Sequence, residues 1–323
     1  MFSAFVKRRR WATVVVFLFL GPVVGMLYLG KGRLALAYFS ASLLAYAAPW
    51  AAAYFSVLDA DPKLVGDLLL WSLHLPGALH GYVIAKPIAG TQPKAWFARW
   101  YAISGLVLVS PVALAVVVRS LLWEPFYIPA GSMKPTLVVG DHLWASKYAY
   151  GYSRFSLPFA PPVVSGRVFG REPQRGDVVL FKVVMDGRPV DYIKRVIGLP
   201  GERIQMRQGR LHISDRTVAR EPVGTETMTG RDGSVRQLVR YEETLPNGRR
   251  HLILEESDDR PLDNTTVYTV PDGHYFVLGD NRDWSLDSRV AEFGFMPYEN
   301  LIGRFEAVFW NSVDRKIRFE RRL

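Results

Sequence analysis

The sequence predicts N-terminal transmembrane α-helices followed by a mostly antiparallel all-β domain. Nearly all long apolar runs lie before residue 124, although the mean hydropathy of the whole chain is only +0.07. After residue 124 the pattern changes to short alternating segments separated by turn residues, which is typical of antiparallel strands. We therefore expect a membrane anchor over residues 1–123 and a β-rich domain over residues 124–323.

The first part of the chain contains four apolar runs, each close to the ~20 residues that a helix needs to cross a bilayer. Gly21-Pro22 and Gly25 interrupt the first run, which leaves a full crossing and a re-entrant hairpin both open. We therefore expect three or four spans. The runs cover residues 11–30, 34–58, 68–85 and 101 to about 122.

Charges between these runs predict the orientation of the anchor. Residues 31–33 and 86–99 carry only basic charges, whereas residues 59–67 carry three aspartates and one lysine. The positive-inside rule places the first two segments in the cytoplasm and the third outside. The last apolar run then delivers the β-rich domain to the outer face of the membrane.

Turn residues and alternating polarity predict eight strands in the second part. Asn247-Gly248 is a strong signal for a hairpin, and Pro271-Asp-Gly273 separates two further strands in the same way. The more polar stretch 206–264 is interpreted as a hairpin-rich insertion. The predicted strands are 178–184, 190–197, 203–206, 210–213, 238–244, 250–255, 265–270 and 274–278.

Composition narrows the function classes. The chain has no cysteine, which excludes disulfides, thiol catalysis and zinc–cysteine sites. Its net charge of +10 would suit a nucleic-acid-binding protein, but no such motif accompanies the basic residues. Many of them flank the apolar runs, where anionic lipid headgroups and cytoplasmic loops account for them. We therefore expect the lipid bilayer as a partner, and no nucleic acid.

Ser132 is a candidate nucleophile at the junction of the two parts. It follows Pro129-Ala-Gly131 and precedes Pro135, so its turn is restricted by two prolines and allows close backbone approach at the glycine. A serine hydroxyl is a weak nucleophile at neutral pH and needs a neighbouring base. Four histidines of the second part are possible bases without a distinctive setting, and exposed strand positions are the simplest interpretation for the last two. They are His142, His212, His251 and His274.

A lysine is the alternative base, because burial in apolar surroundings lowers its pKa and favours the neutral form. In the predicted strand 190–197, alternation places Lys194 on the same face as Tyr192 and Val196, and Arg195 on the other face. Lys134 is closer to the serine in sequence, but nothing in its turn would desolvate it. Residues 191–198 therefore offer Lys194 as a candidate base, and a surface lysine whose amine reaches the solvent is the alternative interpretation.

A third stretch, residues 279–289, is dense in charged and polar residues. It does not fit a calcium-binding EF-hand, because Arg282 and Trp284 stand at the third and fifth positions and Ala291 replaces the closing glutamate. We therefore expect no metal and interpret this stretch as a hydrogen-bonded cluster that supports a site.

Together these stretches resemble the bacterial type I signal peptidases (leader peptidases), a serine–lysine peptidase family. The resemblance covers about residues 124–310 and implies a signal-peptidase-like β-fold. It also implies preproteins with signal peptides as substrates, no cofactor, and the inner membrane with the β-domain on the periplasmic face. Association with the protein export machinery is a further expectation. The matching segments are 124–137, 147–151, 175–181, 191–202, 279–289 and 294–297.

The resemblance also assigns roles to residues. It makes Ser132 the acylating nucleophile, Lys194 the general base and Ser285 the residue that orients this lysine by a hydrogen bond. The polar network that supports the site consists of Asp280, Arg282, Asp287 and Arg289. Residues near the pockets that accept small side chains such as Ala are Phe126, Ile128, Met133, Tyr192 and Ile193.

One position departs from the family pattern. Ala130 stands where the family often has a hydroxyl residue that contributes to the oxyanion hole, so a second donor is missing there. Two alternatives remain open beside the general signal peptidase. One is a Ser/Lys peptidase that matures a single pilin or conjugation substrate, and the other is an inactive membrane-anchored β-domain.

Overall fold

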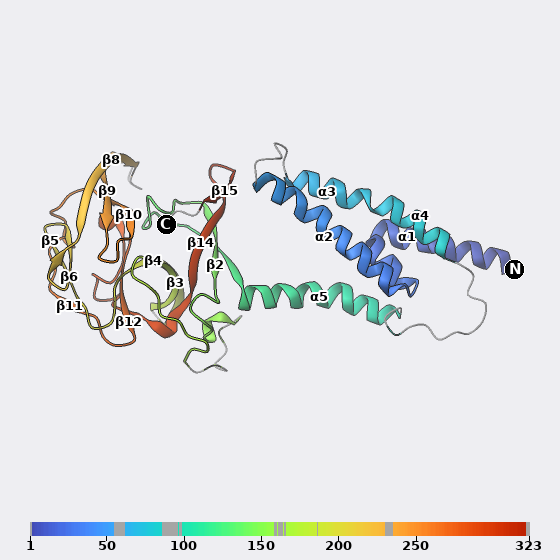
Figure 1. The fold of residues 1–323 in the computed structure, drawn as a ribbon, viewed down its shortest axis with the longest axis horizontal. Coiled ribbons are helices and arrows are strands. Elements are labelled where there is room, and N and C mark those ends of the chain that lie inside the picture. The colour runs from blue at the N-terminus through green and yellow to red at the C-terminus, as the bar shows by residue number, and fades with distance from the viewer. Residues whose placement is uncertain are drawn as a thin grey trace. The chain divides into compact units, whose positions relative to one another are not determined.

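The computed structural model describes residues 2–54, 62–85, 96, 99–157, 160, 164, 166–185, 187–229 and 235–320 (Figure 1). The chain forms two compact units that divide between Ala115 and Val116, inside helix α5 (Trp100–Leu121). The predicted boundary at residue 123 lies just after the end of the same helix. That boundary and the limits of the insertion at 206–264 stay predictions.

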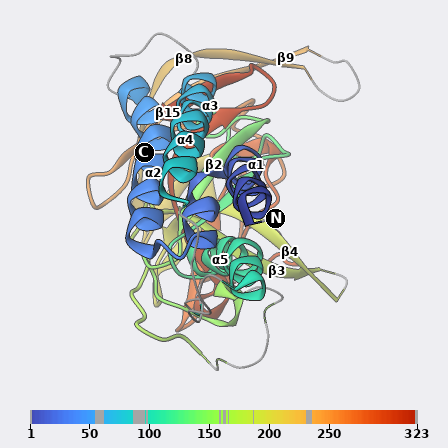
Figure 2. The same ribbon diagram turned by 90° about the vertical axis from the view of Figure 1, so that its right-hand side faces the viewer.

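The first unit is helical. Helix α1 packs against α4 and α2, and α2 packs against α3, so that these helices lie side by side in both views (Figures 1 and 2). Their shared core includes the fully buried Phe17 and Met26. The helices are α1 (Phe2–Tyr28), α2 (Gly32–Tyr54), α3 (Pro62–Ser72) and α4 (His74–Ile84).

Two of the predicted apolar runs are interrupted. In α1, Gly21 has a non-helical backbone conformation (φ 83°, ψ 164°) and Pro22 follows it, so two helical segments meet at a kink. The run 68–85 was predicted as one span, but it forms α3 and α4 with a break at Leu73. Pro76 in the first turn of α4 explains this break, because a proline has no N–H and its ring clashes with the carbonyl four residues earlier.

Among the described residues, one helix is long and apolar enough to cross a membrane, Gly32–Ala52. Shorter apolar helical segments cover Thr13–Tyr28 and Val112–Leu121. The structure therefore supports an N-terminal apolar helix and does not by itself establish three or four spans. Residues 59–61, 86 and 94, which contribute to the predicted orientation, lie outside the described residues.

The second unit is built on an eight-stranded sheet whose strand pairs are antiparallel, which confirms the predicted mostly antiparallel β-domain. The order is β1-β2-β14-β3-β4-β12-β13, and β15 pairs with β14. The strands are β1 (Trp123–Tyr127), β2 (Asp141–Ser146), β3 (Val178–Met185), β4 (Arg188–Gly198), β12 (His274–Leu278), β13 (Met296–Pro297), β14 (Leu301–Asn311) and β15 (Lys316–Glu320).

Two smaller sheets lie in the same unit. We call the three-stranded sheet β10-β9-β8 the insertion sheet; its strands are β8 (Ala219–Thr229), β9 (Val235–Thr244) and β10 (Arg250–Glu255). The other sheet has the order β11-β5-β6-β7, with β5 (Arg203–Arg207), β6 (Arg210–Ile213), β7 (Arg216–Thr217) and β11 (Tyr268–Thr269). Short 3-10 turns cover η2 (Arg154–Ser156), η3 (Arg282–Trp284) and η4 (Tyr298–Asn300).

One predicted hairpin is wrong. The strands on either side of Pro271-Asp-Gly273 do not pair with each other, because β11 pairs with β5 whereas β12 pairs with β4 and β13. Val270 bonds instead with Glu202 and Gly201, and it packs in a core that includes Phe276. The residues Pro271-Asp-Gly273 therefore predicted the turn correctly, but they did not predict which strands pair on either side of it.

Candidate active site

The turn that carries Ser132 directly follows β1 and is anchored by its apolar residues. Met133 and Leu137 are fully buried in the core that also contains Leu143 and Phe305. The Leu137 N–H donates to the Met133 carbonyl at 2.8 Å, which closes the turn. Ser132 is half-buried at the edge of this core, so its position is fixed by its neighbours.

Lys194 on β4 contacts Ser132 as predicted from the sequence. Its Nζ lies 2.7 Å from Ser132 Oγ, and the lysine is only 2% exposed. Burial lowers the pKa of Lys194 to about 8, while the Asp287 and Asp280 charges oppose this shift and Arg289 supports it. An appreciable fraction of this amine is therefore neutral near pH 7 to 8, as a general base requires.

The four histidines have their recorded contacts elsewhere, and in the described residues none of them bonds to Ser132. His142 packs on Trp310, His212 bonds to Thr217, and His274 lies near the Asp272 carbonyl. His251 was predicted to be exposed, but it is only 5% exposed, and its Nε2 lies 3.4 Å from the buried Glu243 carboxylate. Burial, together with Arg195 and Arg282, lowers the pKa of His251 well below its usual value.

Asp280 binds Arg195 rather than Lys194. Arg195 donates to its carboxylate from Nε at 2.8 Å and Nη2 at 2.7 Å, and Thr136 Oγ1 donates at 2.5 Å. All three residues are buried. This cluster ties β4, which carries Lys194, to the turn that carries Ser132. Sequence reasoning missed Arg195 and Thr136, although Arg195 stands beside Lys194 and is a charged residue in an otherwise apolar strand end.

Asp287 and Arg289 form a second buried pair. Asp287 accepts from Arg289 Nε at 2.9 Å and from the Gly279 N–H at 3.1 Å. Although its burial acts to raise the pKa of Asp287, Arg289 and the Gly279 N–H hold it below its usual value. Both residues therefore shape the loop next to Lys194, and the carboxylate stays ionised.

Ser285 does not make the expected hydrogen bond with Lys194. Its Oγ is buried and has no hydrogen-bond partner in the part of the chain that the structure describes. The hydroxyl packs against Gly279, where a Cβ would lie 2.2 Å from Ser285 Oγ and 2.5 Å from the Ser132 carbonyl oxygen. Ser285 and the Ser132 main chain thus both lie against Gly279, but the orienting role of Ser285 is a proposal without a hydrogen bond to support it.

Asn281 is a further residue that sequence reasoning missed. Its N–H donates to the Ser132 carbonyl at 3.1 Å, and its Nδ2 donates to the Gly131 carbonyl at 3.2 Å. These two bonds fix the main chain of the turn that carries Ser132. Arg282, the next residue, was predicted to support the site; its guanidinium pairs with Glu243 of β9, and the supporting role stays a prediction.

An apolar cavity of about 260 Å³ opens in front of Ser132 and Lys194. The predicted pocket residues Phe126, Ile128, Tyr192 and Ile193 line it, together with Ala130. Met133 does not, because its side chain is fully buried in the core. Ala130 is exposed at the rim, and in the described residues the Ser132 N–H has no recorded acceptor, which leaves it available to a ligand.

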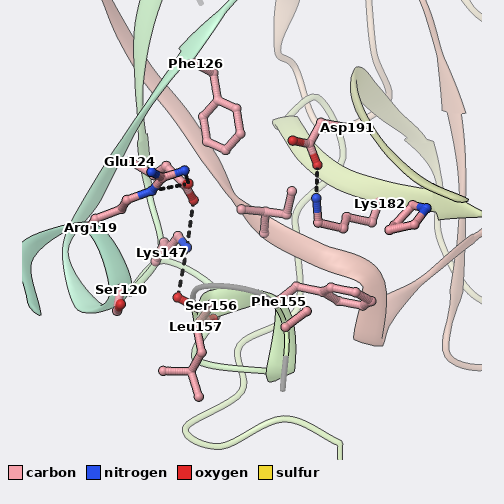
Figure 3. Close-up of a pocket in the computed structure, with 13 residues that line it drawn as sticks. Arg119, Ser120, Glu124, Phe126, Lys147, Phe155, Ser156, Leu157, Lys182 and Asp191 are labelled. Atoms are coloured by element: carbon pink, nitrogen blue, oxygen red, sulfur yellow. Dashed lines mark hydrogen bonds and ion pairs between the residues drawn. The ribbon is translucent and has the colours of Figure 1, made fainter. Parts of the chain in front are cut away.

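A second cavity of about 390 Å³ adjoins the first, and Phe126 and Asp191 line both (Figure 3). Here Lys147 Nζ contacts Glu124 Oε2 at 2.7 Å and donates to the Ser156 carbonyl at 2.9 Å. Burial lowers the pKa of Lys147, and the Glu124 carboxylate opposes that shift. Among the described residues no group of three or more His, Asp or Glu side chains has the arrangement of a metal site.

Known proteins resemble this chain over the residues that form the candidate site. A family profile described as "Signal peptidase, peptidase S26" matches residues 100–310. Signal peptidase I of Rickettsia typhi is 45% identical over 210 residues, which cover 62% of this chain and 77% of that protein. The Rickettsia akari protein of the same name is 43% identical, with 62% and 76% covered. A crystal structure of a signal peptidase I from Enterococcus faecalis aligns with 26% identity and a TM-score of 0.25, covering 42% of this chain and 97% of that one.

Proposed function

This chain belongs to the signal peptidase family, peptidase S26, and we propose that Ser132 and Lys194 are its nucleophile and general base. It is a membrane-anchored serine endopeptidase that removes signal peptides from preproteins. The observation that carries the residue assignment is the contact of 2.7 Å between Lys194 Nζ and Ser132 Oγ, made by a lysine that burial keeps partly neutral.

In the proposed mechanism the neutral Lys194 amine takes the Ser132 hydroxyl proton while Oγ attacks the scissile carbonyl carbon. The protonated lysine then gives this proton to the leaving amine, which departs with the mature protein. A water molecule, deprotonated by the same amine, attacks the acyl-enzyme and releases the signal peptide. Lys194 is free to shuttle the proton because it forms no direct ion pair in the described residues.

Stabilisation of the oxyanion is assigned to the Ser132 N–H, which has no recorded acceptor in the described residues. Ala130 supplies no hydroxyl, so the usual second donor of the family is absent from this side chain. Loss of one preorganised donor typically costs 10²–10³-fold in rate. We therefore expect a water molecule or a main-chain N–H of the substrate complex to complete the hole.

The cavity in front of Ser132 and Lys194, which we call the groove, suits an extended substrate with small side chains. Among the described residues, β1 pairs only with β2, and the first half of β4 pairs only with β3 because β12 begins to pair at Arg195. Two strands next to the cavity therefore have open edges to which a peptide can add as a strand. The apolar lining and the volume of about 260 Å³ favour small residues such as Ala beside the cleavage site.

We propose that α5 delivers the β-domain to the periplasmic face of the inner membrane, and that the anchor crosses the membrane three or four times. The long apolar α2 and the apolar segment Val112–Leu121 support this arrangement. A membrane-bound substrate and enzyme meet at high effective concentration, so a shallow groove is sufficient for binding. Association with the export machinery would bring preproteins to the same surface.

The two alternative functions are not favoured. The named relatives are signal peptidases I, which speaks against a peptidase for one pilin or conjugation substrate. The contact between Ser132 and Lys194 speaks against an inactive β-domain.

The assignment is tested by co-expression with a precursor that carries an Ala-x-Ala cleavage site. We expect wild type to release the mature protein, and Ser132→Ala and Lys194→Ala to release none. Lys134→Ala is the matched control, because this lysine is near the serine in sequence but makes no recorded bond to it, and it should process normally. Processing by Lys194→Ala would contradict the assignment of the base.

A further inference from the structure

The insertion sheet is joined to the loop behind the active site through main-chain hydrogen bonds. The Leu254 N–H of β10 donates to the Asp280 carbonyl at 2.8 Å, and Leu254 forms a parallel bridge with Asn281. A little further on, the Glu256 N–H donates to Asp283 Oδ2 at 2.6 Å. The Gly279–Arg289 loop therefore extends the edge of the insertion sheet rather than lying free on the surface.

A buried ion pair fastens this junction. Arg282 of the loop donates from both terminal nitrogens to the Glu243 carboxylate of β9, at 3.1 and 2.6 Å. Both side chains are only 1% exposed. Burial acts to lower the pKa of Arg282, but the Glu243 charge outweighs it and raises that pKa. The bidentate geometry fixes the orientation as well as the position of the arginine.

His251 lies beside this pair but does not neutralise the negative charge of Glu243. Its Nε2 lies 3.4 Å from Glu243 Oε2, and neither of its ring nitrogens has a hydrogen-bond partner in the described residues. Burial and the nearby Arg195 and Arg282 lower its pKa, so the imidazole is neutral. Arg282 is therefore the cation that balances Glu243.

The loop transmits this constraint to the nucleophile. Asn281, next to Arg282, donates from its N–H to the Ser132 carbonyl at 3.1 Å. Asp280, on the other side of Asn281, binds Arg195, which follows Lys194 on β4. A shift of Arg282 would consequently move both groups that face the reacting atoms.

We propose that Glu243 is a positioning residue, which acts through Arg282 and the Gly279–Arg289 loop to hold Ser132 and Lys194 in reactive geometry. The inference rests on the proposed function, because it assumes that these two residues carry the reaction. The insertion sheet would then contribute to catalysis through Glu243, although Glu243 does not line the groove.

The test compares Glu243→Gln with Glu242→Gln in the full-length protein, purified in detergent and assayed on a peptide with an Ala-x-Ala site. Glu242 is the adjacent residue of β9 and bonds to Arg250 on the surface at 3.4 Å. We expect kcat of Glu243→Gln to fall by about 10²-fold, as for a misplacement of ~1 Å, with KM unchanged because the groove is untouched. Glu242→Gln should retain both constants.

A second variant separates positioning from stability. Replacing both partners, Glu243→Leu with Arg282→Met, removes the buried charges together, which is often neutral for folding. Glu243→Gln breaks one side of the buried pair and should lower Tm. In the double variant we expect Tm to equal that of wild type while kcat stays as low as in Glu243→Gln. Recovery of kcat together with Tm, or an unchanged kcat in folded Glu243→Gln, would overturn the inference. Failure of wild type to cleave any precursor would instead overturn the proposed function.

Discussion

Two lysines of the β-domain are equally buried and have different partners. Lys194 and Lys147 are each 2% exposed, and burial lowers the pKa of both. The Nζ of Lys147 lies 2.7 Å from a Glu124 carboxylate oxygen, whereas that of Lys194 lies 2.7 Å from the Ser132 hydroxyl. The carboxylates that act on Lys194, Asp287 and Asp280, are bound to arginines instead.

If Lys194 is the general base, as we propose, the difference implies that burial alone does not make a base. In the second cavity, the carboxylate in direct contact favours the charged lysine, so burial and ion pairing work against each other (Figure 3). Burial is the largest cause of the lowered pKa at both lysines, but at Lys194 the nearby carboxylates are bound to arginines and none of them contacts the amine directly. The two cavities share Phe126 and Asp191, so this contrast arises between adjacent sites of one domain.

The largest expected effect comes from replacing each lysine by arginine, which keeps the charge but cannot lose it. Lys194→Arg should lose 10²–10⁴-fold in kcat/KM, the usual contribution of a general base. Lys147→Arg should keep most of the activity, because Glu124 and the Ser156 carbonyl accept hydrogen bonds from a permanent cation equally well. The measurement is cleavage of one peptide by both purified variants. Equal losses would remove the distinction between the two lysines.

The pH dependence of kcat/KM gives the next largest effect. The pKa of Lys194 is lowered to about 8, and the reaction needs the neutral amine. Activity should therefore rise with pH, level off above about pH 8, and fall about tenfold for each pH unit below it. Lys147→Arg should show the same acid limb. A limb near pH 6.5, the ordinary pKa of histidine, would point to an imidazole base instead.

These contrasts also show how much the sequence can reveal. Ser132 and Lys194 could be selected as candidates because one lies in a restrained turn and the other on an apolar strand face, and the structure brings their side chains together. The strands β6, β10 and β12 match the predicted ranges 210–213, 250–255 and 274–278 residue for residue, because turn residues precede each of them.

Partners distant in sequence were not predictable. Arg282 and Glu243 are 39 residues apart and lie on separate elements, and no local pattern relates an arginine in a loop to one glutamate among several in a strand. His251 was expected to be exposed because alternation says which residues share a face but not what covers that face. Ser285 was expected to reach Lys194, but the close approach of Gly279 to its hydroxyl is a tertiary feature. Strands β2, β8 and β14 were likewise absent from the prediction.

The smallest effect on catalysis is expected for Lys147→Met, which should alter stability instead. Glu124 would keep Arg119 as a partner, but this arginine is 65% exposed, whereas the lost lysine is buried. Breaking one side of a buried pair is strongly destabilising, so the free energy of unfolding should fall by about 3 kcal/mol, measured by chemical denaturation in detergent. At temperatures where the variant is folded, kcat should equal that of wild type, because Lys147 makes no recorded bond to Ser132 or Lys194.

The double variant Lys147→Met with Glu124→Leu completes the comparison. Removing both charges should restore most of the lost stability, because neither buried group is then left unpaired. A second substitution beside Lys194 should not restore activity in the same way, because none can replace the proton acceptor that is lost with this lysine. If Lys147→Met lowered kcat as far as Lys194→Arg does, the second cavity would be part of the catalytic machinery, and the carboxylate partner would not distinguish the two lysines.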